Sequence, residues 1–166
     1  MYEGDSGLRE LVIRLAQRME RDALIEHSAN YLRDWLKVDR VVLYYFYYEW
    51  KGQVIFESLA STQLSILGST GADDCFNDNY AALYKAGRVR AIADIELESI
   101  HPCHRDFLRS IQVRANLAVP ILNSKKLWGL LIAHHCQEAR PWLLSEIEAM
   151  KEAAETLATA PSIQDS

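Results

Sequence analysis

Two cysteines in the central part of the chain have neighbours that favour reactivity. Cys103 lies in the sequence His-Pro-Cys-His at residues 101–104, where an adjacent imidazole favours the nucleophilic thiolate. Cys75 lies 28 residues upstream, in the sequence Asp-Asp-Cys-Phe at residues 73–76. A single Cys-His pair is more often structural than reactive, so the second thiol matters to the interpretation. We therefore treat Cys103 as the candidate nucleophile and Cys75 as a second thiol.

Other uses of these cysteines fit the sequence less well. No Cys-x2–4-Cys pair occurs, so the spacing of a zinc site is missing. A thiol hydrolase would need a base beside Cys103, but the adjacent His104 rarely has suitable geometry and no oxyanion-hole motif is readable. Cys136 continues an apolar strand and is predicted to be a small core residue. The sequence therefore predicts neither a metal site nor an enzyme.

Composition limits the class of protein further. The chain has 166 residues, of which 49% are apolar and 25% charged, which fits one globular domain. A net charge of -5 gives no reason to expect nucleic acid or an anionic membrane as partner. The apolar runs are shorter than the roughly 20 residues that span a bilayer, and the first residues lack an apolar signal segment. Three cysteines, a low and odd number, argue against a disulfide framework, so we expect reduced thiols and a cytoplasmic location.

Two predicted hairpins must position the candidate residues. Runs rich in β-branched and aromatic residues at 41–48 and 54–59 predict the first hairpin, and runs at 116–122 and 127–136 predict the second. About fifty residues of mixed polarity between them carry both candidate thiols, and we expect loops and short helices there. This order of elements predicts an α+β fold around one antiparallel sheet.

Helices are predicted at both ends of the chain. Apolar residues recur at three- and four-residue steps from Leu8, which predicts a helix that continues towards Lys37. A final helix follows Pro141, with a cap-like Ser145 at its start. Such terminal helices are suited to continue into neighbouring domains or to pair with a second copy of the chain. Residues 161–166 are predicted to be a disordered tail.

Ordered stretches along nearly the whole chain resemble one family. These stretches are residues 87–95, 103–104, 113–121 and 127–136, and with the two thiols they resemble the cyanobacteriochromes. The resemblance implies that residues 1–160 form a single bilin-binding GAF domain. It also implies a central antiparallel sheet of about six strands with flanking helices and helical termini.

The resemblance implies a covalently bound linear tetrapyrrole, either phycocyanobilin or its isomer phycoviolobilin. Cys103 would form the thioether to the A ring, and His104 would pack against the ring system. The Asp-x-Cys-Phe pattern, filled here by Asp73, Cys75 and Phe76, resembles the subclass in which a second cysteine adds reversibly to the central methine bridge. That addition interrupts the conjugation, so the adducted state should absorb blue light and the released state longer wavelengths.

Further residues follow from the needs of such a ligand. Its buried pyrrole N–H groups need acceptors, and we expect Asp73 to supply one. Its propionates need cationic partners, and Arg88 is the expected one, while Tyr84 is expected to line the D-ring side. If the strand alternates regularly, His134 shares a face with Trp128 and its neighbours Leu130 and Ile132, so that it could reach the D ring. No Trp lies between Trp50 and Trp128, which disfavours a red/green photocycle.

The sequence thus predicts a photoreceptor domain that converts between a blue-absorbing and a longer-wavelength state by bilin isomerisation and reversible ligation of the second cysteine. The partners expected are the bilin, the output domain of a longer sensor and a second copy of the chain. The alternative is a GAF domain that binds a small ligand such as a cyclic nucleotide without a covalent bond, or that only dimerises. Covalently bound pigment would distinguish the photoreceptor from this alternative. A site for the phosphate of a cyclic nucleotide needs cationic or amide donors but no nucleophilic thiol.

Overall fold

A five-stranded antiparallel sheet forms the centre of the molecule. The computed structural model describes residues 3–70, 77–124 and 126–166. The strands are β1 (Arg40–Tyr48), β2 (Lys51–Leu59), β3 (Arg90–Ile92), β4 (Ala115–Asn123) and β5 (Lys126–His135). Their order in the sheet is β2-β1-β5-β4-β3, and all neighbouring pairs are antiparallel. The α+β class, the antiparallel sheet and both hairpins are confirmed, with five strands in the described residues instead of about six.

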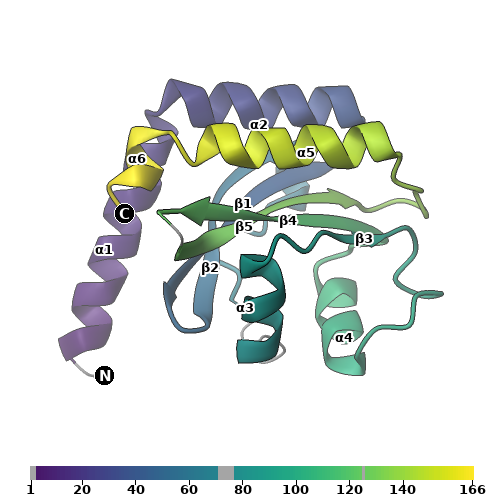
Figure 1. Cartoon of the computed structure of the whole chain (residues 1–166), viewed down its shortest axis with the longest axis horizontal. Coiled ribbons are helices and arrows are strands. Elements are labelled where there is room, and N and C mark those ends of the chain that lie inside the picture. The colour runs from purple at the N-terminus through teal and green to yellow at the C-terminus, as the bar shows by residue number, and fades with distance from the viewer. Residues whose placement is uncertain (1–2, 71–76, 125) are drawn as a thin grey trace.

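Helices cover the two faces of the sheet differently. They are α1 (Glu3–Glu20), α2 (Ala23–Leu36), the short 3-10 helix η1 (Thr62–Leu64), α3 (Asp78–Lys85), α4 (Pro102–Ser110), α5 (Leu144–Leu157) and α6 (Pro161–Gln164). Helices α2 and α5 lie side by side over one face, and α3 and α4 lie on the opposite side (Figure 1). Among the described helices, none is both long and apolar enough to cross a bilayer.

The alternation of β1 divides the core into two layers. Successive side chains of a strand point to opposite faces, so the apolar run of β1 supplies both layers. The residues that pack with the layer of α2 and α5 are Val41, Leu43 and Tyr45. Those that pack on the other side, with residues of α3, are Val42, Tyr44 and Phe46. A strand that is buried on both faces is thus explained by helices on both sides of the sheet.

A bulge in β5 changes which face Trp128 occupies. Leu127 pairs with Leu122 and Gly129 pairs with Ile121, so Trp128 is an extra residue in the ladder. Its ring is fully buried on the α2 and α5 side, with its centroid 4.9 Å from that of Tyr45. The prediction that Trp128 shares a face with His134 is therefore wrong, because regular alternation holds only after the bulge.

The terminal segments also differ from the predictions. The N-terminal helix is interrupted at Asp22, whose carboxylate caps α2 by accepting the Leu24 N–H at 3.2 Å. The segment predicted to be a disordered tail instead forms α6, with Ile163 fully buried. The Ser162 hydroxyl donates to Asp22 at 2.8 Å, and the Asn123 amide donates to the Ile163 carbonyl at 2.8 Å. Burial of one apolar side chain and these hydrogen bonds explain why the segment is ordered.

Candidate functional site

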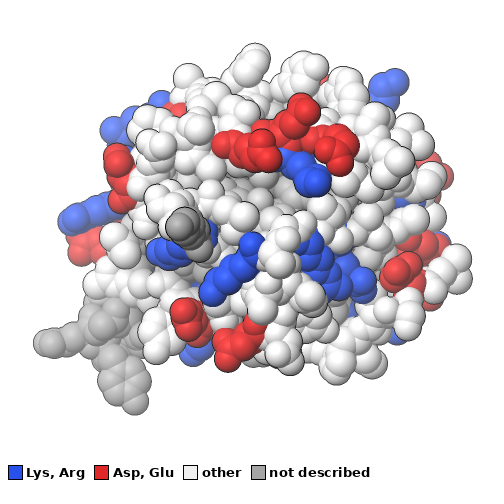
Figure 2. Space-filling model, in the orientation of Figure 1, with Lys and Arg blue, Asp and Glu red and all other residues white. Residues whose placement is uncertain are grey.

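A cavity of about 310 Å³ lies on the side of the sheet opposite α2 and α5. This volume is at the lower end of the range for small-molecule sites, roughly 300–1,000 Å³. Its apolar floor comes from β1 and β5, with Val42, Leu130 and Ile132 among the lining residues. Basic side chains gather across the middle of the face shown in Figure 2, and a group of acidic side chains lies above them, over α5. The lining also includes Arg88 and Arg90, so the cavity combines an apolar floor with cationic side chains.

The cavity brings together four of the predicted site residues. Its lining includes Tyr84 from α3, Arg88 after α3, His104 from α4 and His134 from β5. The other predicted residues are Cys103 on the first turn of α4 and three that lie outside the described residues, Asp73, Cys75 and Phe76. Segments that are far apart in the sequence therefore converge on one site.

Cys103 occupies the second position of α4. Pro102 opens the helix, and His101 caps it, because its Nδ1 accepts the Cys103 backbone N–H at 3.0 Å. Cys103 is half-buried and lies between two histidines that line the cavity, His101 and His104. Once reduced, a thiolate at this position would lie at the positive end of the helix dipole.

The redox state of Cys103 differs from the prediction. Cys103 is disulfide-bonded in this structure, whereas Cys136 is a free, half-buried thiol. The prediction of reduced thiols is therefore wrong for Cys103. An odd number of cysteines excludes a complete set of disulfides, but it does not exclude a single one.

Two of the histidines that line the cavity, His104 and His134, are neutral at physiological pH. Burial, followed by the charges of Arg90 and Arg88, lowers the pKa of His104 to about 4. Burial lowers the pKa of His134 well below its ordinary value, and the neighbouring Arg40 and His104 act in the same direction. A neutral His104 supplies no positive charge to Cys103, so the electrostatic support for a thiolate comes from the position of Cys103 at the N-terminus of α4.

Cationic side chains border the cavity beside α3. Gly87 has φ of 98°, a left-handed conformation that ends α3 and turns the chain towards β3. The guanidinium of Arg88 then lies 5.7 Å from the ring centroid of Tyr80 and 5.8 Å from that of Tyr84. Burial raises the pKa of Tyr84, so its hydroxyl stays protonated. Arg90 also lines the cavity, which gives the site two cations where the sequence predicted one.

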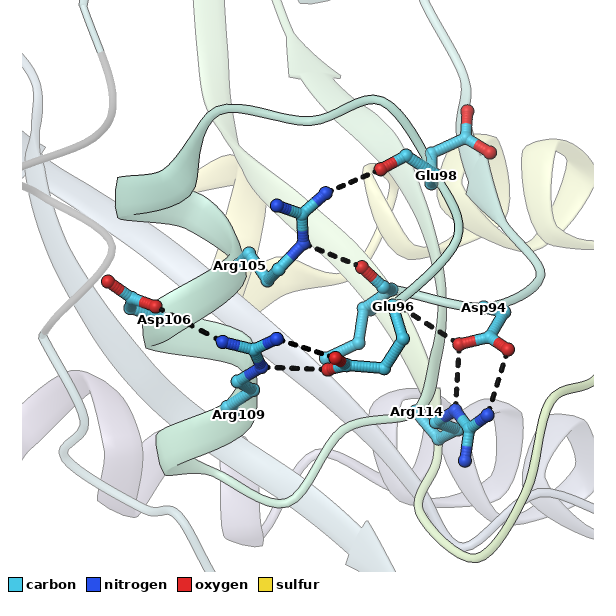
Figure 3. Close-up of polar contacts among 8 residues, drawn as sticks. Asp94, Glu96, Glu98, Arg105, Asp106, Arg109 and Arg114 are labelled. Atoms are coloured by element: carbon cyan, nitrogen blue, oxygen red, sulfur yellow. Dashed lines mark hydrogen bonds and ion pairs between the residues drawn. The ribbon is translucent and has the colours of Figure 1, made fainter.

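Arginines of α4 fix this helix to the loop that precedes it (Figure 3). Arg105 donates to the carbonyl oxygens of Ile95, at 2.9 Å, and Glu98, at 2.6 Å. Arg109 makes two hydrogen bonds to the Glu96 carboxylate, at 2.8 and 2.5 Å. Since Cys103 and His104 lie on the first turn of the same helix, these bonds hold them in place relative to the loop at residues 95–98.

A buried arginine that the sequence analysis missed contacts His134. Arg40 is 1% exposed, and its Nε donates to His134 Nδ1 at 3.0 Å. Its position just before a predicted strand did not indicate a buried residue, because an arginine next to a loop is ordinarily exposed. Only the pairing of β1 with β5, which places Arg40 opposite His134, brings the two side chains together.

Comparison with known proteins gives consistent results. Residues 20–160 of the chain match the GAF domain family. The chain is 51% identical to an uncharacterized protein of Picosynechococcus sp. (strain PCC 7002), over 97% of this chain and 99% of that protein. It is 40% identical to a putative methyl-accepting chemotaxis protein of Synechocystis sp. (strain PCC 6803), over 85% of this chain but only 14% of that protein.

Solved structures of GAF domains are similar over most of the chain. The blue-light absorbing form of the Thermosynechococcus elongatus PixJ GAF domain has a TM-score of 0.79 and 34% identity, over 90% of this chain and 88% of that one. The phycocyanobilin-bound GAF domain of a cyanobacterial phytochrome has a TM-score of 0.76 and 29% identity, over 99% and 96%. The fold of the chain is thus shared with these domains.

Proposed function

We propose that this chain, which belongs to the GAF domain family, is a photoreceptor domain that binds a linear tetrapyrrole covalently through Cys103. One observation carries the proposal: Cys103 lies on the first turn of α4, between two histidines that line an apolar cavity with cations at its border. Similarity to a GAF domain described as phycocyanobilin-bound supports phycocyanobilin, or its isomer phycoviolobilin, as the ligand. A bound bilin would supply the light absorption and the photoisomerisation.

The residues of the cavity fit such a ligand in three ways. Val42, Leu130 and Ile132 offer a flat apolar floor for conjugated rings. The neutral rings of His104 and His134 offer hydrogen bonds without adding charge to an apolar space. Arg88, to which we add Arg90, would bind the two propionates.

The second thiol completes the proposal. Asp73, Cys75 and Phe76 lie outside the described residues, so their roles rest on the Asp-x-Cys-Phe pattern and on its resemblance to the dual-cysteine subclass. Asp73 would accept hydrogen bonds from the pyrrole N–H groups. Cys75 would bond reversibly to the pigment and so produce the blue-absorbing state. Tyr84, which is buried on α3 and lines the cavity, would border the D ring.

The experiment that tests this function is an absorbance spectrum before and after illumination. The protein is treated with a dithiol reductant, because a disulfide-bonded Cys103 has no free thiolate, and the reductant is removed before phycocyanobilin is added. We expect a pigment that survives acid denaturation and that light converts between a short- and a longer-wavelength state. A colourless protein would contradict the proposal and favour a non-covalent small ligand or a dimerisation role.

The cations at the border of the cavity give a second prediction. The variant Arg88→Gln keeps a polar side chain but shortens it and removes the charge, so it should weaken bilin uptake by about 10-fold, the size of one charge-assisted hydrogen bond. Absorbance titration under reducing conditions measures this change. Arg14→Gln is the matched control, because Arg14 is exposed on α1 and pairs only with Glu10 among the contacts described. Equal uptake by both variants would mean that Arg88 binds no propionate.

Assembly into a larger system is the remaining part of the proposal. Similarity to a short segment of a putative chemotaxis protein supports a role beside a separate output domain. Exposed apolar side chains on α1, among them Leu11 and Ile13, support pairing with a second copy through the terminal helices. We also propose a cytoplasmic location, since a thiol that must react with a ligand requires reducing conditions.

A further inference from the structure

Arg40 is a buried cation whose hydrogen-bond partners are all neutral. Its Nε donates to His134 Nδ1 at 3.0 Å, Nη1 to the Leu64 carbonyl at 2.5 Å and Nη2 to the Ile111 carbonyl at 2.7 Å. Burying a charge is unfavourable unless its donors are satisfied, and here each of the three nitrogens has an acceptor. Two of those acceptors belong to residues that line the cavity, His134 and Ile111, so the role of Arg40 extends beyond holding the fold together.

The bond from Arg40 determines which nitrogen of His134 carries the proton. A guanidinium has only donors and keeps its protons in proteins, so His134 Nδ1 must offer a lone pair. Because the pKa of His134 lies well below its ordinary value, the ring is neutral and has a single proton. That proton must therefore be on Nε2. With Nδ1 engaged by Arg40, Nε2 is the nitrogen left to contact a ligand in the cavity that His134 lines.

The charged groups around this pair keep the arrangement stable. Burial lowers the pKa of Arg40, and the electrostatic influence of Cys136 after β5, Glu57 on β2 and Asp39 just before β1 opposes that shift. A guanidinium keeps its protons in proteins, so Arg40 is charged despite its burial. His134 is faced by Arg40 and by His104 from α4, both of which disfavour a charge on its ring. The guanidinium thus stays charged and the imidazole stays neutral, which is the combination that the hydrogen bond requires.

We propose that Arg40 is a positioning residue that fixes His134 as the Nε2–H tautomer, so that the cavity presents a hydrogen-bond donor to a carbonyl oxygen of its ligand. The opposite tautomer would place a lone pair against that oxygen. Arg40 also binds the end of η1 and the end of α4, so one side chain sets both the protonation and the position of the ring. The carbonyl ligand rests on the proposed function, because a bilin carries such oxygens on its terminal rings, whereas the tautomer is a property of the protein alone.

The test uses the ligand-free, ¹⁵N-labelled protein. Long-range ¹H–¹⁵N correlation of the histidine rings should show one His134 tautomer, with a protonated Nε2 and an unprotonated Nδ1, throughout pH 6 to 8, roughly the range in which an ordinary histidine titrates. A His134→Gln variant assigns the signals. A scalar coupling between Arg40 Nε and His134 Nδ1 across the hydrogen bond should be visible in the same wild-type sample. A ring protonated on Nδ1, or a charged ring at pH 7, would overturn the proposal.

Variants of Arg40 then test whether this residue is what fixes the tautomer of His134. In Arg40→Met, which keeps the bulk but removes the donors, the two ring nitrogen shifts of His134 should move towards each other as both tautomers become populated. Arg40→Lys, which keeps a charge but loses the fixed Nε–H, should restore the single tautomer only in part. Arg33→Met is the matched control, because Arg33 is half-buried but donates to Ser58 instead, and it should leave His134 unchanged. An unchanged tautomer in a folded Arg40→Met variant would contradict the proposal, and if that variant does not fold, the wild-type coupling decides.

The same samples separate this inference from the proposed function. A single Nε2–H tautomer in a protein that takes up no bilin would support the role of Arg40 and contradict the photoreceptor proposal. Bound, photoactive pigment in a protein whose His134 carries its proton on Nδ1 would do the reverse. The two proposals therefore fail on different measurements.

Discussion

The variant Cys103→Ala is expected to lose covalent pigment attachment completely. The thioether needs a sulfur at the first turn of α4, and alanine offers none while leaving the helix and its His101 cap intact. The cavity should still take up bilin without a covalent bond, since its floor and its cations do not depend on the sulfur. Pigment fluorescence in a denaturing gel, compared with native absorbance, measures both effects.

Cys136 provides the matched control for this loss. It is a free, half-buried thiol after β5, and its backbone N–H donates to the Asp39 carboxylate at 2.7 Å. Burial raises the pKa of its thiol, which disfavours the nucleophilic form. Cys136→Ala should therefore retain attachment at the wild-type level. Covalent pigment in Cys103→Ala would show that another residue carries the bond.

The variant Cys75→Ala is expected to keep its pigment and to lose the blue-absorbing state. If the second thiol bonds to the middle of the bilin, it divides one long conjugated system into two short ones, which absorb at higher energy. Without that thiol the pigment should absorb only at longer wavelengths, before and after illumination. Absorbance spectra at both photostationary states measure the change.

Cys75→Ser separates the chemistry of the second thiol from its size. Serine has nearly the same volume, but its hydroxyl is a much weaker nucleophile than a thiolate at neutral pH. It should therefore behave like alanine. A blue-absorbing state that persists in both variants would rule out the two-thiol photocycle while leaving attachment through Cys103 untouched.

The two hairpins could be predicted from the local sequence, because runs of β-branched and aromatic residues bounded by turn residues are typical of strands. The convergence of Tyr84, His104 and His134 was predicted only through the resemblance to a family. Local patterns carry no information about which segments meet in space. The cavity follows from the sheet order, in which the two hairpins meet through β1 and β5.

The misses have physical causes that single-sequence patterns do not contain. The face of Trp128 depends on a bulge that breaks regular alternation, and a bulge has no composition of its own. The C-terminal segment folds as α6 because Ser162 and Ile163 contact residues far away in the sequence. Arg40 was missed because its partner His134 is 94 residues away. For α6 and Arg40, contacts between residues far apart in the sequence decided the outcome.

The division of the core by the sheet determines how the domain could transmit a change in its ligand. The cavity lies on one side, and α2 and α5 lie on the other, so the strands separate the ligand from these helices. A rotation of a ligand ring would therefore reach the helices as a tilt or twist of β1 and β5, whose alternate side chains face both layers. The mechanical stiffness of these two central strands would then set how much of the motion arrives.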